Sequence, residues 1–233
     1  MFYDFIKHQS FAISRWGAFF NHFDLFFKGF LYTLGISFGA LLLALILGIL
    51  SGGLSTSKSK VGKLISRIYV EVFQNTPLLV QMVFVYYGLA IISNGHVMIS
   101  AFFTAVLCVG LYHGAYISEV IRSGIEAVPK GQTEAALAQG FTANQTMQFI
   151  ILPQAVRTIL PPMTNQVVNL IKNTSTVAII SGADIMFVAK AWAYDTTNYI
   201  PAFAGAAIFY FVICFPLASW ARKQEELNKK TYS

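Results

Sequence analysis

Long apolar runs constrain the fold of this chain more than any other feature of its sequence. They occupy residues 23–54, 68–92, 97–121, 149–180 and 199–220. Each run is long enough for an α-helix to cross the hydrocarbon core of a bilayer, which takes about 20 residues. Only 11% of the residues are charged, compared with about 25% in ordinary soluble domains. We therefore predict an all-α integral membrane protein with five transmembrane helices.

The segments outside these runs are short. Residues 1–22 mix aromatic and basic side chains and are predicted to lie at the membrane interface. Basic residues at 51–67 predict the first clear loop, and residues 122–148 form the longest connection between runs. Residues 222–233 form a polar tail, so we interpret residues 23–221 as one transmembrane domain.

Basic residues are distributed unequally between the two sides that five spans define. The larger set comprises Lys58, Lys60, Lys63, Arg67, Arg122, Lys130, Arg157, Arg222, Lys223, Lys229 and Lys230, and the smaller set comprises Lys7, Arg15, Lys28 and Lys190. Because loops rich in Lys and Arg stay in the cytoplasm, the pattern predicts an N-terminus outside the cell and a cytoplasmic C-terminus. The net charge of +6 is then a topology signal, and we expect no nucleic-acid partner.

Metal, redox and nucleotide chemistry find little support in the sequence. The four histidines show no metal-ligand spacing. Cys108 and Cys214 lie within apolar runs, where cysteine behaves as a small hydrophobe. A phosphate-binding loop starting at Gly52 is excluded because Ser57 occupies the position of its second glycine. We expect no metal site, no disulfide and no cofactor bound to this chain.

A specific pattern spans the longest connection and the start of the fourth run. Residues 134–153 read EAALAQGFTANQTMQFIILP, in which a Glu-Ala-Ala triplet is followed after three residues by glycine and after nine more by Ile-x-Leu-Pro. The marked positions are Glu134, Ala135, Ala136, Gly140 and Pro153. Because this stretch is exposed between membrane spans, it is a candidate docking surface. The alternative is an amphipathic connector that lies on the bilayer.

Two short helices around a turn are predicted for this stretch. Residues 133–139 are rich in good helix formers, and Gly140 can cap their C-terminal end. A second helix is predicted to start at Thr142 or Asn144, either of which can act as its N-cap. We expect this helix to continue until Pro153 disturbs it.

The fourth run carries polar side chains that are costly in a bilayer. Asn165, Asn169, Lys172, Asn173 and Thr176 recur at helical spacing and therefore share one face. A lysine at the centre of a span costs about 2.5 to 3.5 kcal/mol on insertion scales, so Lys172 is expected to face a cavity or a counter-charge. The alternative is that its ammonium group reaches a nearby membrane surface.

The second and third runs carry polar stripes of their own. The residues concerned are Glu71, Gln74, Asn75 and Gln81 on one predicted face beside Thr76 and Pro77, and Tyr112, Tyr116, Glu119 and Ser123 on another. Glu119 either lines a path or simply pairs with Arg122 in its own helix. A zwitterionic amino acid needs donors for its carboxylate and acceptors for its ammonium group, and Asn, Thr, Ser, Lys and Glu side chains supply both. The predicted pathway residues are Glu71, Gln74, Asn75, Thr76, Gln81, Glu119, Asn169, Lys172, Asn173, Thr174 and Ser175.

The pattern at residues 134–153 resembles the cytoplasmic coupling loop of bacterial ABC importer permeases. Further segments resemble the permeases of polar amino acid importers, the group with the glutamine, glutamate/aspartate, histidine and arginine systems. They read EVFQNTPLLVQ at 71–81, AYISEVIRSGIEAVPKGQTEAA at 115–136, LPQAVRTILPPMTNQVVNLIKNTS at 152–175 and ISGADI after that. One departure is Gln74, where the family pattern usually has arginine, so no basic contact is carried over there.

The resemblance implies a type I ABC importer permease fold and a division of labour. Two permease subunits, identical or similar, would enclose the path within membrane lipid. Two cytoplasmic ATPase subunits would bind ATP and Mg²⁺, and an extracellular or periplasmic binding protein would deliver the amino acid, glutamine or glutamate/aspartate. This chain would catalyse no reaction, would lie in the bacterial plasma (inner) membrane and would receive the ATPase movement through residues 134–140.

Two other functions compete with this interpretation. The first is a secondary amino acid carrier independent of ATP, in which Lys172 and Glu119 form an ion-coupling pair. It would make the coupling pattern coincidental. The second is a membrane anchor or assembly factor without transport activity, for which the three polar stripes would serve no purpose.

Overall fold

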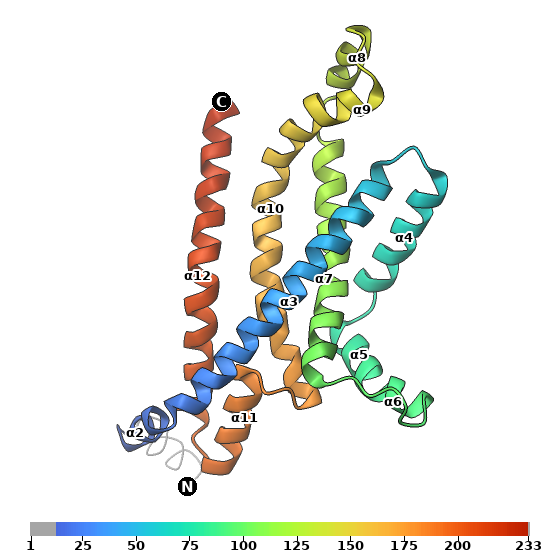
Figure 1. Ribbon diagram of the computed structural model, residues 1–233. Helices are drawn as coiled ribbons and strands as arrows, with labels where there is room; N and C mark the ends of the chain where they lie inside the picture. Colours follow the sequence, from blue (N-terminus) through green and yellow to red (C-terminus); the bar gives the residue numbers. More distant parts are fainter. Residues whose placement is uncertain (1–12, 233) are drawn as a thin grey trace.

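The computed structural model describes the backbone of residues 13–232 and the side chains of residues 14–223. Part of the predicted interfacial segment and most side chains of the tail therefore lie outside the described residues. All regular structure in the described part is helical (Figure 1). The helices are α2 Ile13–Asn21, α3 Phe23–Thr56, α4 Lys60–Gln74, α5 Leu78–Val83, α6 Leu89–Ile92, α7 Ala101–Glu126, α8 Lys130–Ala138, α9 Ala143–Gln145, α10 Leu152–Asn173, α11 Ile185–Thr196 and α12 Tyr199–Tyr232, with π-helical turns at Phe84–Gly88 and Thr146–Ile151 and a 3-10 helix at Thr174–Ile180.

Three helices of the described part are long and apolar enough to cross a membrane: α3, α7 and the Tyr199–Lys223 part of α12. Two further segments meet the same criterion only as bent pairs. Helix α4 meets the α5–α6 segment at 95°, and the helical segment Ala143–Ile180 meets α11 at 46°. Counting each bent pair as one span gives five, so the predicted all-α membrane fold is confirmed although two spans are broken.

The loop predicted at residues 51–67 is wrong, because almost all of it is helical. Helix α3 continues to Thr56, and α4 begins at Lys60 after a short turn. The hydroxyl of Ser59 accepts a hydrogen bond from the Gly62 N–H at 3.1 Å and caps the new helix. The basic residues that suggested a loop lie on an amphipathic helix, whose exposed apolar residues are Val61, Leu64, Ile65, Ile68 and Val72.

Other helix bounds also differ from the predicted ones. Helix α7 begins at Ala101 and extends to Glu126, so the first residues of the predicted connection 122–148 are helical. The helix that enters the fourth span starts at Ala143 instead of residue 149. Helix α11 was not predicted, because it is too short to cross a bilayer by itself.

Close contact between α3 and α7 forms the centre of the bundle. A Cβ on Gly48 of α3 would overlap the side chain of Ile117, so only glycine allows this approach. Buried serines join a third helix to the pair: Ser51 of α3 lies 2.8 Å from the hydroxyl of Ser66 in α4 and accepts a hydrogen bond from Ser118 of α7 at 2.9 Å. These bonds fasten α4 to the central pair.

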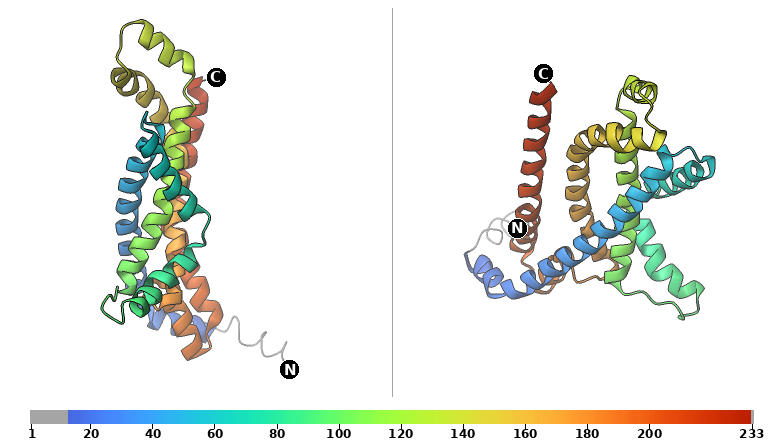
Figure 2. Two further views of the ribbon diagram at one scale, coloured as in Figure 1. Left: turned by 90° about the vertical axis from the view of Figure 1, so that its right-hand side faces the viewer. Right: turned by 45° about the horizontal axis from the view of Figure 1, so that its top comes forward.

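A second core lies at the end of the molecule that holds α2. Aromatic side chains of α2, α3 and α11 meet there, with Phe26 5.5 Å from Trp192 and 4.7 Å from Phe19, measured between ring centroids. At the opposite end lie α8, α9, the turn between α3 and α4, and the C-terminal end of α12 (Figures 1 and 2). The molecule therefore has two distinct ends, with the coupling pattern at one of them.

Candidate functional sites

The α8–α9 hairpin, defined as residues 130–145, carries the Glu-Ala-Ala-glycine pattern. Gly140 has a φ of +91°, a left-handed conformation that suits glycine. Its N–H donates to the carbonyl of Leu137 at 3.0 Å, and the N–H of Phe141 donates to the carbonyl of Ala136 at 3.1 Å. These two bonds form a Schellman motif, which ends α8 sharply. The predicted glycine cap is confirmed.

The second helix of the hairpin, α9, starts after Thr142, which is one of the two predicted N-caps. The hydroxyl of Thr142 accepts from the Gln145 N–H at 3.3 Å, and the side-chain carbonyl oxygen of Gln145 accepts from the Thr142 N–H at 2.8 Å. This reciprocal capping box fixes the entry of the helix. Pro153 does not end the helix, but the helix is irregular just before it. The π-helical turn Thr146–Ile151 separates α9 from α10, and Pro153 lies in the first turn of α10.

The hairpin presents part of its pattern to solvent. Ala136 is buried, and α8 packs through this side on the turn Thr146–Ile151. Glu134, Ala135 and Gly140 are exposed. The hairpin extends beyond the ends of the membrane helices (Figure 1), so its exposed face is free to contact another protein.

Part of the predicted pathway lines one hollow between α3, α4 and α7, the charged pocket, with a volume of about 470 Å³. Its lining includes Lys63, Glu71, Gln74, Asn75, Glu119 and Arg122. Arg122 holds two carboxylates of its own helix, that of Glu119 at 2.7 Å and that of Glu126 at 2.6 Å. Glu119 therefore pairs with Arg122, as one of the two alternatives predicted. It still lines the charged pocket.

Two amides of the α4 end border the charged pocket in different ways. The side-chain amide of Gln74 donates to the carbonyl of Ala115 at 3.2 Å and ties α4 to α7. The amide of Asn75 donates to the Glu71 carboxylate at 2.9 Å, one turn back along the chain. Both residues line the charged pocket, but part of their hydrogen-bonding capacity is used inside the protein.

The predicted shared face of Gln81 with Glu71, Gln74 and Asn75 is wrong, because the chain bends between them. Pro77 carries no N–H and favours an extended conformation of the residue before it, so α4 cannot continue. The Gln81 amide donates to the carbonyls of Phe73 at 3.2 Å and Thr76 at 3.1 Å, and to the Thr76 hydroxyl at 2.7 Å. Gln81 and Thr76 hold the bend, and neither lines the charged pocket.

A second hollow, the amide pocket, collects the polar face of the fourth span against α7. It has a volume of about 370 Å³, and its lining includes Tyr112, His113, Tyr116, Asn169, Lys172 and Asn173. Tyr116 lies three residues before Glu119, so the amide and charged pockets follow one another along α7. The ammonium-bearing side chain of Lys172 is exposed, so it faces this open hollow instead of apolar core.

His113 is a member of the amide pocket that sequence reasoning missed. It is only 2% exposed, and its Nε2 lies 3.0 Å from the side-chain amide nitrogen of Asn173, from which it accepts a hydrogen bond. Its Nδ1 has no hydrogen-bond partner among the described residues. A lone histidine in an apolar run carries no spacing signal, so only the packing of α7 against α10 reveals this contact.

Thr174 and Ser175 do not line either pocket. Thr174 is buried, and its hydroxyl donates to the carbonyl of Ile171 at 2.7 Å. The hydroxyl of Ser175 donates to the carbonyl of Lys172 at 2.7 Å. Both hydroxyls thus provide donors for backbone carbonyls at the end of α10, where it tightens into a 3-10 helix. Across the described residues, no group of three or more His, Cys, Asp or Glu side chains is arranged to hold a metal ion.

Comparison with known proteins identifies the family. The family described as binding-protein-dependent transport system inner membrane component matches residues 26–226. The probable glutamine ABC transporter permease protein GlnM of Bacillus subtilis is 34% identical over 213 residues, covering 91% of this chain and 97% of that protein. The putative glutamine transport system permease protein GlnP of Rickettsia felis is 36% identical over 187 residues, covering 80% and 85%.

A solved structure gives the same answer for the fold. The crystal structure of an amino acid ABC transporter with histidines superimposes with a TM-score of 0.83 at 32% identity, over 90% of this chain and 96% of that chain. The resemblance to ABC importer permeases is thus confirmed by sequence and by structure. This chain belongs to the family of binding-protein-dependent transport system inner membrane components.

Proposed function

We propose that this chain is the membrane-spanning permease subunit of an ATP-driven importer for a polar amino acid, with glutamine as the first candidate and glutamate or aspartate as the second. The chain is a multi-pass membrane transport component and not itself an enzyme. The observation that carries the proposal is the exposed α8–α9 hairpin with its complete pattern, in a chain related to permeases named for glutamine transport.

The hairpin is proposed to dock on a separate cytoplasmic ATPase, which binds ATP and Mg²⁺. Glu134 and Ala135 are exposed on α8, and the Schellman motif at Gly140 ends α8 and turns the chain toward α9. Its packing on the turn Thr146–Ile151 links α8 to α10. A displacement of α8 by the ATPase would therefore move α10 and the pocket residues that α10 carries.

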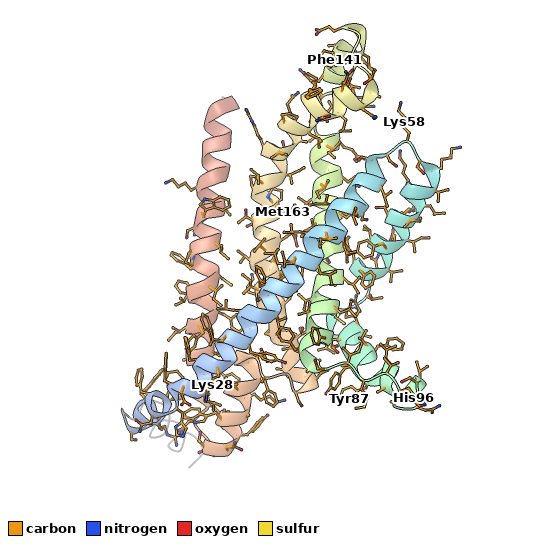
Figure 3. All side chains as sticks on the ribbon, viewed as in Figure 1. Lys28, Lys58, Tyr87, His96, Phe141 and Met163 are labelled. Carbon is orange, nitrogen blue, oxygen red and sulfur yellow. The ribbon has the colours of Figure 1, made fainter. Side chains whose placement is uncertain are left out.

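The proposed orientation places the N-terminus outside and the C-terminus in the cytoplasm. Lys58 at the turn between α3 and α4 lies at the same end of the molecule as Phe141 of the hairpin (Figure 3). The C-terminal end of α12 lies at this end as well (Figure 1). Lys28 lies at the opposite end, near α2 (Figure 3). The concentration of basic residues at the hairpin end supports a cytoplasmic hairpin.

The amino acid is proposed to pass along α7 between the two pockets. In the amide pocket, Lys172, Asn169 and Asn173 carry donors that suit a carboxylate, and in the charged pocket Glu71 carries an acceptor that suits an ammonium group. The residues proposed to line the path are Glu71, Gln74, Asn75, Glu119, Asn169, Lys172 and Asn173. The other predicted pathway residues do not line the path. They are proposed to stabilise the helices that form it, through the hydrogen bonds described above for Thr76, Gln81, Thr174 and Ser175.

A second permease subunit, the same chain or a similar one, is proposed to complete the path. Exposed apolar side chains are spread over α3 and α12, including Phe38, Leu50 and Phe211, which are each more than 60% exposed. Such surface requires membrane lipid or a second subunit to cover it. A binding protein outside the cell is proposed to deliver the amino acid, as the description of the family indicates.

Uptake of labelled glutamine by proteoliposomes tests this function. The liposomes contain this chain, its ATPase and its binding protein, and a matched set contains an ATPase inactivated in its phosphate-binding loop. The competing secondary carrier would transport without the ATPase. It would rely on pairing between Lys172 and Glu119, whereas the Glu119 carboxylate is held by Arg122 at 2.7 Å.

A further inference from the structure

A third hollow lies where the membrane helices meet the hairpin. It shares Ser55 and Lys63 with the charged pocket, and the rest of its lining belongs to neither pathway pocket. This lysine pocket has a volume of about 480 Å³. Its polar lining consists of the ammonium groups of Lys63 and Lys130, the hydroxyls of Ser55, Thr56 and Thr133, and one carboxylate. The polar lining therefore comes from the ends of α3 and α7, from α4 and from α8.

The positive charges of the lysine pocket are not neutralised within the described part of the protein. Lys63 and Lys130 are both exposed, and neither forms an ion pair among residues 14–223. The one carboxylate in the lining, that of Glu126, is held by Arg122 at 2.6 Å. Two such ammonium groups suit the oxygens of a phosphate group. The hydroxyls of Ser55 and Thr56 donate to the carbonyl of Gly52 at 2.7 and 3.2 Å, so the two lysines carry the phosphate contact.

The rest of the lining is apolar, and it argues for a lipid over a soluble anion. It comprises Ile125, Val128, Met147 and Ile151. A free phosphate ion gains nothing from these side chains, whereas an acyl chain or glycerol backbone buries apolar surface against them.

The position of the pocket agrees with the depth of lipid headgroups. Helix α3 ends at Thr56 and α7 ends at Glu126, and both residues line the pocket. Both helices are long enough to cross the hydrocarbon core, so their ends lie where the headgroups begin. Lysines at this depth attract anionic lipids by about 1 kcal/mol each.

We propose that the lysine pocket binds an anionic phospholipid, with its phosphate between Lys63 and Lys130 and its apolar part along Ile125, Met147 and Ile151. A bound lipid would bridge α4 and α8, and so would hold the hairpin against the membrane helices. The site depends neither on which solute is transported nor on which end of the molecule faces the cytoplasm. Its test therefore needs no transport activity.

Native mass spectrometry of the purified full-length chain, titrated with phosphatidylglycerol or phosphatidylcholine, measures this binding. We predict that the unaltered chain binds phosphatidylglycerol in preference to phosphatidylcholine. Lys63→Ala with Lys130→Ala is predicted to weaken phosphatidylglycerol binding about 30-fold, which corresponds to about 1 kcal/mol for each lysine. Lys63→Arg with Lys130→Arg keeps the charge and is predicted to keep the preference.

A matched control removes the same charge from the opposite end. Lys28→Ala with Lys190→Ala alters the end of the molecule opposite to the hairpin, where Lys28 lies (Figure 3) and where α11, which carries Lys190, lies as well (Figure 1). This variant is predicted to leave lipid binding unchanged. The thermal unfolding midpoint of every variant is measured as well, so that a variant that has lost lipid binding can be distinguished from one that has lost its fold. Equal phosphatidylglycerol binding by the folded Lys63→Ala, Lys130→Ala variant overturns the proposal. Displacement of the lipid by millimolar inorganic phosphate would identify a soluble-anion site and overturn it as well.

Discussion

Gly140 is the residue at which backbone geometry and the proposed coupling function meet. With a φ of +91°, it holds a conformation that strains other L-residues by roughly 1 to 2 kcal/mol. A Cβ at this position would meet no neighbouring atom within 4 Å, so a substitution acts through the backbone alone. We predict that Gly140→Ala lowers ATP-dependent uptake per assembled complex by roughly 5- to 30-fold, if the strain is relieved by moving α8.

The control for this prediction lies in the same helix. Gly131 of α8 has equally open surroundings and no positive φ, so Gly131→Ala is predicted to leave uptake unchanged. Both variants are compared in proteoliposomes, with the amount of bound ATPase measured by pull-down. Equal uptake by the two variants would contradict a coupling role for the turn at Gly140.

Lys172 carries the charge that the proposed path offers to a carboxylate. Because hydrogen bonds to charged groups contribute about 1.5 to 3 kcal/mol, we predict that Lys172→Ala raises the KM for amino acid uptake roughly 10- to 150-fold without loosening ATPase attachment. Lys190→Ala in α11 removes an exposed lysine elsewhere and is the control. If Lys172→Ala instead loses the ATPase in a pull-down and transports normally per assembled complex, Lys172 is structural.

At the scale of elements, the bend between α4 and α5 depends on Gln81. Its amide holds the carbonyls of Phe73 and Thr76, which lose their helical partners at Pro77. We predict that Gln81→Met lowers the free energy of unfolding by about 1 to 3 kcal/mol, because both carbonyls lose their donor. The thermal midpoint of the purified chain measures this loss. Gln148→Met, at an exposed position, is the control, and equal midpoints would contradict the role of Gln81.

Features that depend on neighbouring residues in the sequence were predicted well. Features that depend on contacts between distant parts of the chain were missed. The turn at Gly140 was predicted, and Thr142 was one of two predicted caps, because the residues that form these features lie within one helical turn. The 95° angle between α4 and the α5–α6 segment follows from the missing N–H of Pro77, from the contacts of Gln81 and from the packing of α5 on α7. Basic residues near 51–67 suggested a loop because charge lowers hydropathy, although an amphipathic helix has the same composition.

The pocket residues also divide into those predictable from spacing along one helix and those that depend on tertiary contacts. Polar stripes at helical spacing correctly predicted that Asn169, Lys172 and Asn173 share a face. The stripe that joined Gln81 to Glu71 failed, because helical spacing has no meaning across a bend. His113 was not predicted as a pocket residue, because its contact with Asn173 joins residues 60 positions apart in the sequence.

At the scale of the whole molecule, α7 connects the proposed sites. Its glycine-lined face packs on α3, its polar face lines the amide and charged pockets, and its end lines the lysine pocket. The hairpin follows directly after α7 in the chain and joins α10 on its other side. A force on the hairpin therefore reaches both walls of the amide pocket, as the proposed coupling requires.

ATP-dependent uptake in proteoliposomes that contain the chain, its ATPase and its binding protein tests the proposed importer most directly. Labelled glutamine, glutamate, arginine and histidine are compared, with and without ATP inside the liposomes. We predict uptake of one polar amino acid, glutamine first, that disappears without ATP or with an inactive ATPase. Uptake that persists in liposomes containing this chain alone would contradict the importer and favour a secondary carrier.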